Sequence, residues 1–159
     1  MKKAVIWGIA VIVLLTGGFL IYSKDKNIQK AGGIGVDPGH PFLKKYQKEF
    51  EDHAVIRAAQ EDVNNDGKKD LLVVYHPKDD EKNYSIVLIN KDDKDYILSK
   101  TAVAPRENVD IKFKNIDDKD NVEFIISGSK NGNYGYAIYR LKEDLEIRDL
   151  FSEDMDNCC

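Results

Sequence analysis

The chain has 159 residues, enough for one small domain together with a membrane segment. Its formal net charge is -4 and 33% of its residues are charged, so it lacks the basic surface of nucleic-acid-binding proteins, and a nucleic-acid partner is excluded. It contains only 2 cysteines, which is too few for a small domain held together by a disulfide framework.

The N-terminus carries a long uncharged segment. Two lysines, Lys2 and Lys3, precede an apolar run from Ala4 to Tyr22. A helix of roughly 20 apolar residues spans a bilayer, whereas the apolar core of a secretory signal is shorter, about 7 to 15 residues. We therefore predict an uncleaved single-pass anchor over residues 1–22, with the following domain on the extracytoplasmic side of the cell membrane. A cleaved signal peptide is the alternative.

A tether and a short helix are predicted next. Residues 23–40 are polar and glycine-rich without periodicity, which is typical of a flexible tether. Residues 41–51 begin with Pro41 and place apolar side chains on one helical face, namely Phe42, Leu43, Tyr46 and Phe50. This spacing predicts a short amphipathic helix at the start of the folded domain.

The remainder of the domain has the pattern of short strands. Eight apolar or alternating segments are separated by short linkers rich in Asp, Asn and Gly, which predicts antiparallel meanders in a mainly β fold. The first segment is also compatible with the end of a helix. The eight segments are residues 54–60, 70–75, 84–90, 95–100, 109–114, 122–127, 135–141 and 145–150.

An internal repeat organises these strands. Residues 62–73 align with residues 115–126, and each loop is followed by a buried strand, a tyrosine-containing strand and a closing strand. We infer two tandem four-stranded antiparallel meanders, each resembling a propeller blade, in a β-repeat domain over residues 41–151. Two blades do not close a propeller. We expect them to pack face to face, or side by side with the helix covering a face.

The first repeat loop has the ligand spacing of a calcium site. Its pattern, D-x-N-x-D-G-x-x-D, puts oxygen ligands at alternate positions and a glycine at the sharp turn. The expected ligands are the side chains of Asp62, Asn64, Asp66 and Asp70 and the backbone carbonyl of Lys68. The loop resembles the strand–loop–strand calcium loops of FG-GAP and VCBS-type blade repeats, which implies a structural Ca2+. A plain Asn-Asp-Gly turn is the alternative.

Other metal or catalytic patterns are weaker. Val73 stands where an EF-hand requires a carboxylate, so the first loop is no EF-hand. The second repeat loop has Lys119 in place of Asp66, and we expect it to bind no metal. Three histidines occur singly and are expected to be surface or capping residues, and the Asp-Asp pairs are expected in solvated turns. The histidines are His40, His53 and His76.

The chain ends in two adjacent cysteines, Cys158 and Cys159, after an acidic run over residues 152–159. Such a tail has too little apolar surface to order itself, so we expect the thiols to be exposed and to act through their reactivity. Three chemistries fit the pair: a reversible disulfide, capture of a soft metal, and thiol exchange with another protein. With no third cysteine, the pair cannot complete a structural zinc site from thiolates.

The anchor, the repeat-containing β domain and the terminal Cys158-Cys159 pair together resemble the Cys-Cys-COOH (seleno)protein family called SaoC. In that family selenocysteine can replace one terminal cysteine, whereas this chain has sulfur at both positions. The resemblance implies that the pair binds or passes on a soft metal or organometal of the organomercurial type. It also implies transporter components and a thioredoxin-like protein as partners.

The leading hypothesis is therefore a membrane-anchored extracytoplasmic thiol protein that captures or relays a soft metal or organometal, without being a conventional enzyme. One alternative is a thiol–disulfide redox partner of a thioredoxin-like protein. The other is a calcium-stabilised β-repeat binding module of a membrane complex.

Overall fold

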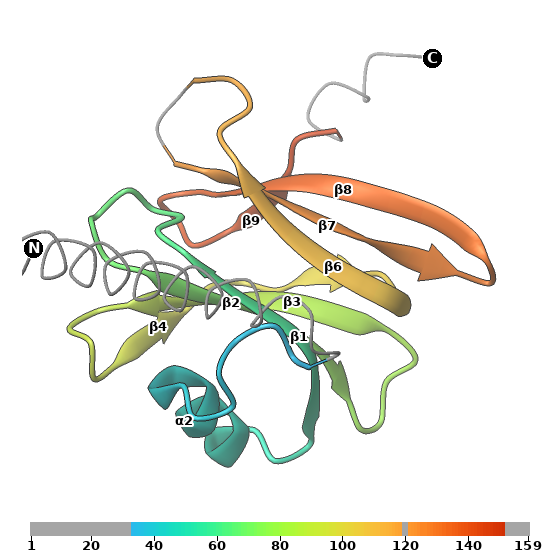
Figure 1. Cartoon of the computed structure of the whole chain (residues 1–159), viewed down its shortest axis with the longest axis horizontal. Helices are drawn as coiled ribbons and strands as arrows, with labels where there is room; N and C mark the ends of the chain where they lie inside the picture. The colour runs from blue at the N-terminus through green and yellow to red at the C-terminus, as the bar shows by residue number, and fades with distance from the viewer. Residues whose placement is uncertain (1–32, 119–120, 152–159) are drawn as a thin grey trace, which may run out of the picture.

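The computed structural model describes residues 33–118 and 121–151 (Figure 1). The predicted anchor over residues 1–22 lies outside these ranges, and within them no helix is long and apolar enough to span a membrane. The described elements are one helix and nine strands: α2 (Pro41–Glu49), β1 (His53–Glu61), β2 (Asp70–Pro77), β3 (Asn83–Asn90), β4 (Tyr96–Leu98), β5 (Ala102–Ala104), β6 (Glu107–Lys114), β7 (Glu123–Lys130), β8 (Asn133–Leu141) and β9 (Ile147–Asp149).

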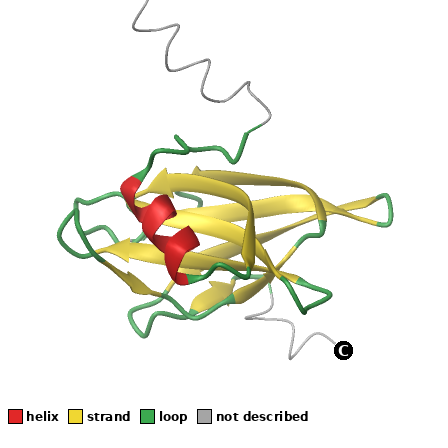
Figure 2. Ribbon diagram, turned by 90° about the horizontal axis from the view of Figure 1, so that it is seen from below, coloured by secondary structure: helices red, strands yellow, loops and turns green. Residues whose placement is uncertain are grey.

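The strands form two antiparallel sheets that follow one another along the chain. The first sheet has the order β1-β2-β3-β4, with β5 also paired to β3, and the second has the order β6-β7-β8-β9. Figure 1 shows the two sheets stacked, and Figure 2 shows α2 lying across the first sheet. The predicted mainly β fold, with two successive antiparallel meanders and a leading helix, is confirmed. The sheets pack face to face, and the helix covers the outer face of the first.

The fourth strand of the first meander differs from the prediction. The expected strand over residues 95–100 is shortened to β4, and β5, which was not predicted, follows it; the two pair with opposite halves of β3. Ser99 lies between them. Its backbone N–H donates to the Val87 carbonyl at 3.0 Å and its hydroxyl accepts the Val87 N–H at 2.9 Å. The Ser99 hydroxyl thus takes the place of a backbone carbonyl as the acceptor. Hydrogen bonding along β3 therefore continues between β4 and β5.

Residues of β2 and β3 contribute to two apolar clusters, one on each face of the first sheet. This explains why the sequences of both strands are continuously hydrophobic. Alternate residues of β2 point to opposite faces: Leu72 and Val74 enter the core between the sheets, whereas Leu71 and Val73 pack beneath the helix. All four are at most 1% exposed. A strand covered on both faces has no polar face, so its sequence loses the alternation seen in half-buried strands.

Helix α2 is fastened to the first sheet by its aromatic residues. Tyr46 is fully buried, and its hydroxyl lies 2.7 Å from Nδ1 of His53 at the start of β1. The His53 ring stacks on Phe50 on one side and on Tyr75 of β2 on the other, with centroid separations of 5.0 and 4.1 Å. The turn between α2 and β1 is therefore set by a packed column of rings.

In the described part of the chain, the second sheet packs against the first through one of its faces. Ile111, Phe124 and Ile126 belong to the core between the sheets. On β8, Tyr139 and Leu141 enter the same core, whereas the first four residues of the strand are exposed. The described residues include no element over the outer face of this sheet.

Candidate functional site

The two cysteines of the leading hypothesis, Cys158 and Cys159, lie outside the described residues. The structure instead shows where the chain leaves the domain. The Leu150 N–H donates to the Ile138 carbonyl at 2.9 Å, and the Phe151 N–H donates to the Asp149 carboxylate at 2.9 Å. Phe151 is itself 47% exposed. The last described residue is thus held at the surface of the second sheet.

The predicted calcium loop joins β1 to β2 and is closed by its own backbone amides. The two carboxylate oxygens of Asp62 accept the N–H groups of Asp66 and Gly67, at 3.1 and 2.8 Å. The Asn64 side-chain oxygen also accepts the Asp66 N–H at 3.1 Å. Asn65 and Gly67 have positive φ values, 61° and 83°, so the turn needs residues that tolerate the left-handed region. Asp62, Asn64 and Asp66 are therefore brought together by the turn.

Asp70 occupies a different environment at the start of β2. It is 1% exposed, and its carboxylate oxygens accept the N–H groups of Val63 at 3.1 Å and Asn90 at 2.8 Å. Burial raises the pKa of Asp70 to about 6, with a further contribution from the nearby carboxylates of Asp66 and Asp62, although the two hydrogen bonds oppose the rise. This carboxylate fixes the base of the loop.

The loop brings three carboxylates, those of Asp62, Asp66 and Asp70, near one another. Among residues 33–118 and 121–151, no lysine or arginine forms an ion pair with Asp62, Asp66 or Asp70. The Lys68 ammonium donates instead to the Lys91 carbonyl at 2.6 Å. No group of three His, Cys, Asp or Glu side chains in these ranges is arranged to hold a metal ion. In the conformation described, the side-chain oxygens of Asp62 and Asn64 accept hydrogen bonds from backbone N–H groups of the same loop.

The second repeat loop reproduces the framework of the first. Glu123 aligns with Asp70, and its carboxylate accepts the Ile116 N–H at 2.9 Å, just as Asp70 accepts that of Val63. Asp118 aligns with Asn65 and has a similar positive φ, 56°. The repeat predicted from the sequence therefore has a matching backbone arrangement.

The second loop differs in having an internal cation. The Arg140 guanidinium, on β8, forms ion pairs with Glu123 and with Asp117, the latter at 2.6 Å. Glu123 is fully buried and Arg140 is 9% exposed, so this is an interior charge cluster. Asp117 lies in an exposed bend, as predicted, and its carboxylate in addition binds the guanidinium. The sequence reasoning missed Arg140, whose only signal was a charged residue at the end of an apolar strand.

The loop between β3 and β4 links the first repeat loop to the helix. Asn90, whose N–H binds Asp70, accepts the Asp93 N–H through its side-chain oxygen at 2.8 Å. A few residues on, Asp95 accepts a hydrogen bond from the Lys45 ammonium at 2.5 Å. Polar contacts therefore run from the loop over residues 62–70, through the β3–β4 loop, to α2.

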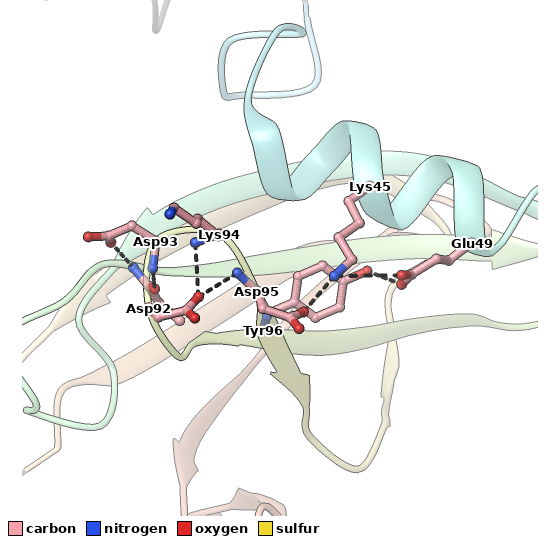
Figure 3. Close-up of polar contacts among 8 residues, drawn as sticks. Lys45, Glu49, Asp92, Asp93, Lys94, Asp95 and Tyr96 are labelled. Atoms are coloured by element: carbon pink, nitrogen blue, oxygen red, sulfur yellow. Dashed lines mark hydrogen bonds and ion pairs between the residues drawn. The ribbon is translucent and has the colours of Figure 1, made fainter.

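Figure 3 shows the helix end of this network. The Tyr96 hydroxyl donates to the Glu49 carboxylate, and the Lys45 ammonium lies 5.0 Å from the centre of the Tyr96 ring. The hydrogen bond from Lys45 lowers the pKa of the Asp95 carboxyl. Asp92 accepts the Lys94 and Asp95 N–H groups, as expected for an aspartate in a turn. These contacts clamp α2 to the first sheet.

The three histidines make separate contacts. His53 is packed between rings, which corrects the expectation of a surface residue, and His76 contacts the Asn83 side chain at 3.0 Å. His40 is the N-cap residue of α2 but makes no capping hydrogen bond, and its Nδ1 is buried without a partner within the described part. It borders an open groove of about 720 Å3 that also includes Gln60 and Lys112. None of the predicted ligand residues lines this groove.

No family model matches the chain, and neither a curated protein nor a solved structure is significantly similar to it.

Proposed function

We propose that this chain is a membrane-anchored extracytoplasmic thiol protein whose terminal pair, Cys158 and Cys159, captures or relays a soft metal or organometal. The observation that supports the proposal is the position of the chain exit: Phe151 is held at an exposed site on the second sheet, next to the eight remaining residues, 152–159. Both apolar clusters are built without a cysteine. The domain thus serves as a carrier for the pair.

The chemistry is ligand exchange at one sulfur at a time. Thiolates are preferred ligands of soft ions, whereas two adjacent residues are poorly placed to flank an ion that prefers linear coordination. In capture, an organomercury cation binds one cysteine sulfur as the thiol releases its proton. The resemblance stated above suggests transporter components and a thioredoxin-like protein as its partners.

Intact mass spectrometry of the full chain in detergent, with and without phenylmercuric acetate, tests this proposal. We expect a mass increase of one or two phenylmercury groups. The double variant Cys158→Ser, Cys159→Ser should show none, and the neighbouring variant Asn157→Ser should bind as the parent does. Undiminished binding by the double variant would rule the proposal out. A mixed disulfide with a thioredoxin-like protein, trapped in either single cysteine variant, would favour the redox alternative.

A second candidate function, a calcium-stabilised binding module, is favoured by the difference between the two repeat loops. In the second loop, Arg140 neutralises the buried carboxylate of Glu123. The first loop has three carboxylates and no such cation among the described residues. We infer that Ca2+ neutralises the carboxylates of the first loop, as Arg140 neutralises Glu123 in the second. Oxygen atoms suit such a hard cation, and here they come from the side chains of Asp62, Asn64, Asp66 and Asp70 and from the Lys68 carbonyl. The loop resembles those of blade-type repeats in this respect.

Calorimetric titration of the full chain with Ca2+ tests the second candidate. We expect one site per chain and a higher melting temperature with calcium than with a chelator, because binding to the native state alone stabilises it, by about 2.7 kcal/mol at a hundredfold excess over Kd. Asp66→Ala should abolish the heat of binding, whereas Asp118→Ala, in the second loop, should not. Binding that survives Asp66→Ala would show that the ion lies elsewhere.

A further inference from the structure

Three exposed aromatic residues lie on β8 and at the point where the chain leaves the domain. Tyr134 and Tyr136 on β8 are 73% and 57% exposed, and Phe151 is 47% exposed. The rings of Tyr136 and Phe151 meet edge to face, with centroids 5.7 Å apart. We call these three residues the exit patch. They form the only such group among the described residues, because the other exposed large apolar side chains lie singly on other elements.

The fold itself does not require these rings. The apolar residues of β8 that enter the core are further along the strand, namely Ala137, Tyr139 and Leu141. Tyr134 and Tyr136 lie on the part of β8 that is exposed throughout, where packing does not require an apolar side chain. Large aromatic residues gathered at a surface are typical of interaction sites, since they bury much area at little cost in conformational entropy.

The number of residues between Phe151 and the cysteines limits how far the thiols can lie from the patch. Eight residues follow Phe151, and Cys159 is the last of them. Fully extended, eight residues reach roughly 26 to 29 Å. Because β9 pairs with β8 and the Leu150 N–H binds the Ile138 carbonyl, the starting point of this reach is fixed beside the patch. Whatever exchanges a ligand with the cysteines therefore comes within that distance of Phe151, whose ring contacts Tyr136.

We propose that the exit patch docks the protein that exchanges metal with the cysteine pair, and that this partner presents its own cysteine in an apolar rim. The inference rests on the proposed function. In the exchange, the partner's thiol sulfur bonds to the metal as its proton is released, the bond from the metal to Cys158 or Cys159 breaks, and that cysteine takes up a proton. No electron is gained or lost, so no oxidant or reductant is needed.

Docking through the patch makes transfer selective for the partner over small thiols. Metal transfer from one sulfur to the other then takes place within a complex and not by free collision. Docking therefore raises the local concentration of the partner's thiol. Free small thiols gain nothing from the patch, so the metal is retained until an apolar-rimmed cysteine arrives. Tyrosine is among the residues that carry most binding free energy at interfaces, which suits Tyr134 and Tyr136 to this role.

The test measures transfer from the phenylmercury-loaded full chain in detergent to two synthetic peptides of equal charge. One peptide flanks its cysteine with Leu and Phe, and the other with Ser and Gly. We expect transfer to the apolar peptide to be about tenfold faster, equivalent to about 1.4 kcal/mol, and to saturate with peptide concentration. The double variant Tyr134→Ser, Tyr136→Ser should lose this preference while its transfer to the polar peptide stays unchanged. Partition of peptide into micelles is the same for both proteins.

Val103→Ser provides the matched control, because Val103 is 54% exposed on β5, in the other sheet, and should leave the preference intact. An equal rate for the two peptides with the parent protein would overturn the inference, as would a preference that survives the double tyrosine variant. Both results leave phenylmercury binding in place. A parent chain that takes up no phenylmercury would instead refute the proposed function, and the docking inference with it.

Discussion

Replacing Asp70 by asparagine should change how the free energy of unfolding depends on pH. The Asp70 carboxylate is 1% exposed and accepts two backbone N–H groups. An asparagine side chain can accept one of these bonds, but its amide group then faces the other N–H. Leaving that buried donor unpaired costs about 1 to 3 kcal/mol at every pH.

The pH-dependent part comes from the raised pKa. The Asp70 pKa is about 6 in the folded chain, against an ordinary value of 3.8. This difference of about 2 units corresponds to roughly 3 kcal/mol, at 1.36 kcal/mol per unit. Because the folded pKa is raised, the stability that the protonated carboxyl contributes is complete below about pH 4 and is lost as the pH rises through about 6. Asparagine does not titrate, so the variant lacks this loss.

Thermal and urea unfolding of the full chain in detergent, followed by far-ultraviolet circular dichroism from pH 4 to 8, would measure both effects. The stability advantage of the parent over Asp70→Asn should shrink by about 3 kcal/mol between pH 4 and 8. Asp79→Asn, in an exposed turn, is the control and should show no such trend. If the difference in free energy of unfolding between the parent and Asp70→Asn stays constant or grows with pH, the raised pKa assigned to the buried Asp70 carboxyl is refuted.

Three further changes test other parts of the fold by thermal unfolding. Arg140→Met leaves the buried Glu123 without its cation and should cost about 3 to 5 kcal/mol, most of which returns when Glu123→Met is added. Tyr46→Phe removes the 2.7 Å contact with the β1 histidine and should cost about 1 kcal/mol. Phe124→Ala opens a cavity between the sheets and should cost about 3 to 5 kcal/mol, whereas Val103→Ala, at an exposed site, should stay within about 0.5 kcal/mol. Losses of equal size at the last two sites would contradict the assigned core.

The strands and helix were predictable because their sequences repeat at the period of the element. Phe42, Leu43 and Tyr46 share one face of α2, and all three are buried as the helical spacing predicted. The repeat loops were likewise found from their spacing. The split between β4 and β5 was not predictable, because it depends on a hydrogen bond from the Val87 N–H to the Ser99 hydroxyl across the sheet.

The charge cluster in the second loop needed three-dimensional information as well. Arg140 and Glu123 are 17 residues apart, and only the pairing of β7 with β8 brings the side chains together. The choice between face-to-face and side-by-side packing of the meanders depended on the same kind of long-range contact. The calcium ligands and the roles of Cys158 and Cys159 stay predictions, to be decided by the titration and mass measurements above.

The unequal cover of the two sheets has a consequence for how such a protein can diversify. A substitution in the doubly covered strands of the first sheet disturbs packing on one side or the other, and most such changes are costly. The first four positions of β8, residues 133–136, carry no such constraint, because they contact solvent. Natural variation can therefore accumulate there, and alter which molecules are recognised, while the scaffold beneath keeps its stability.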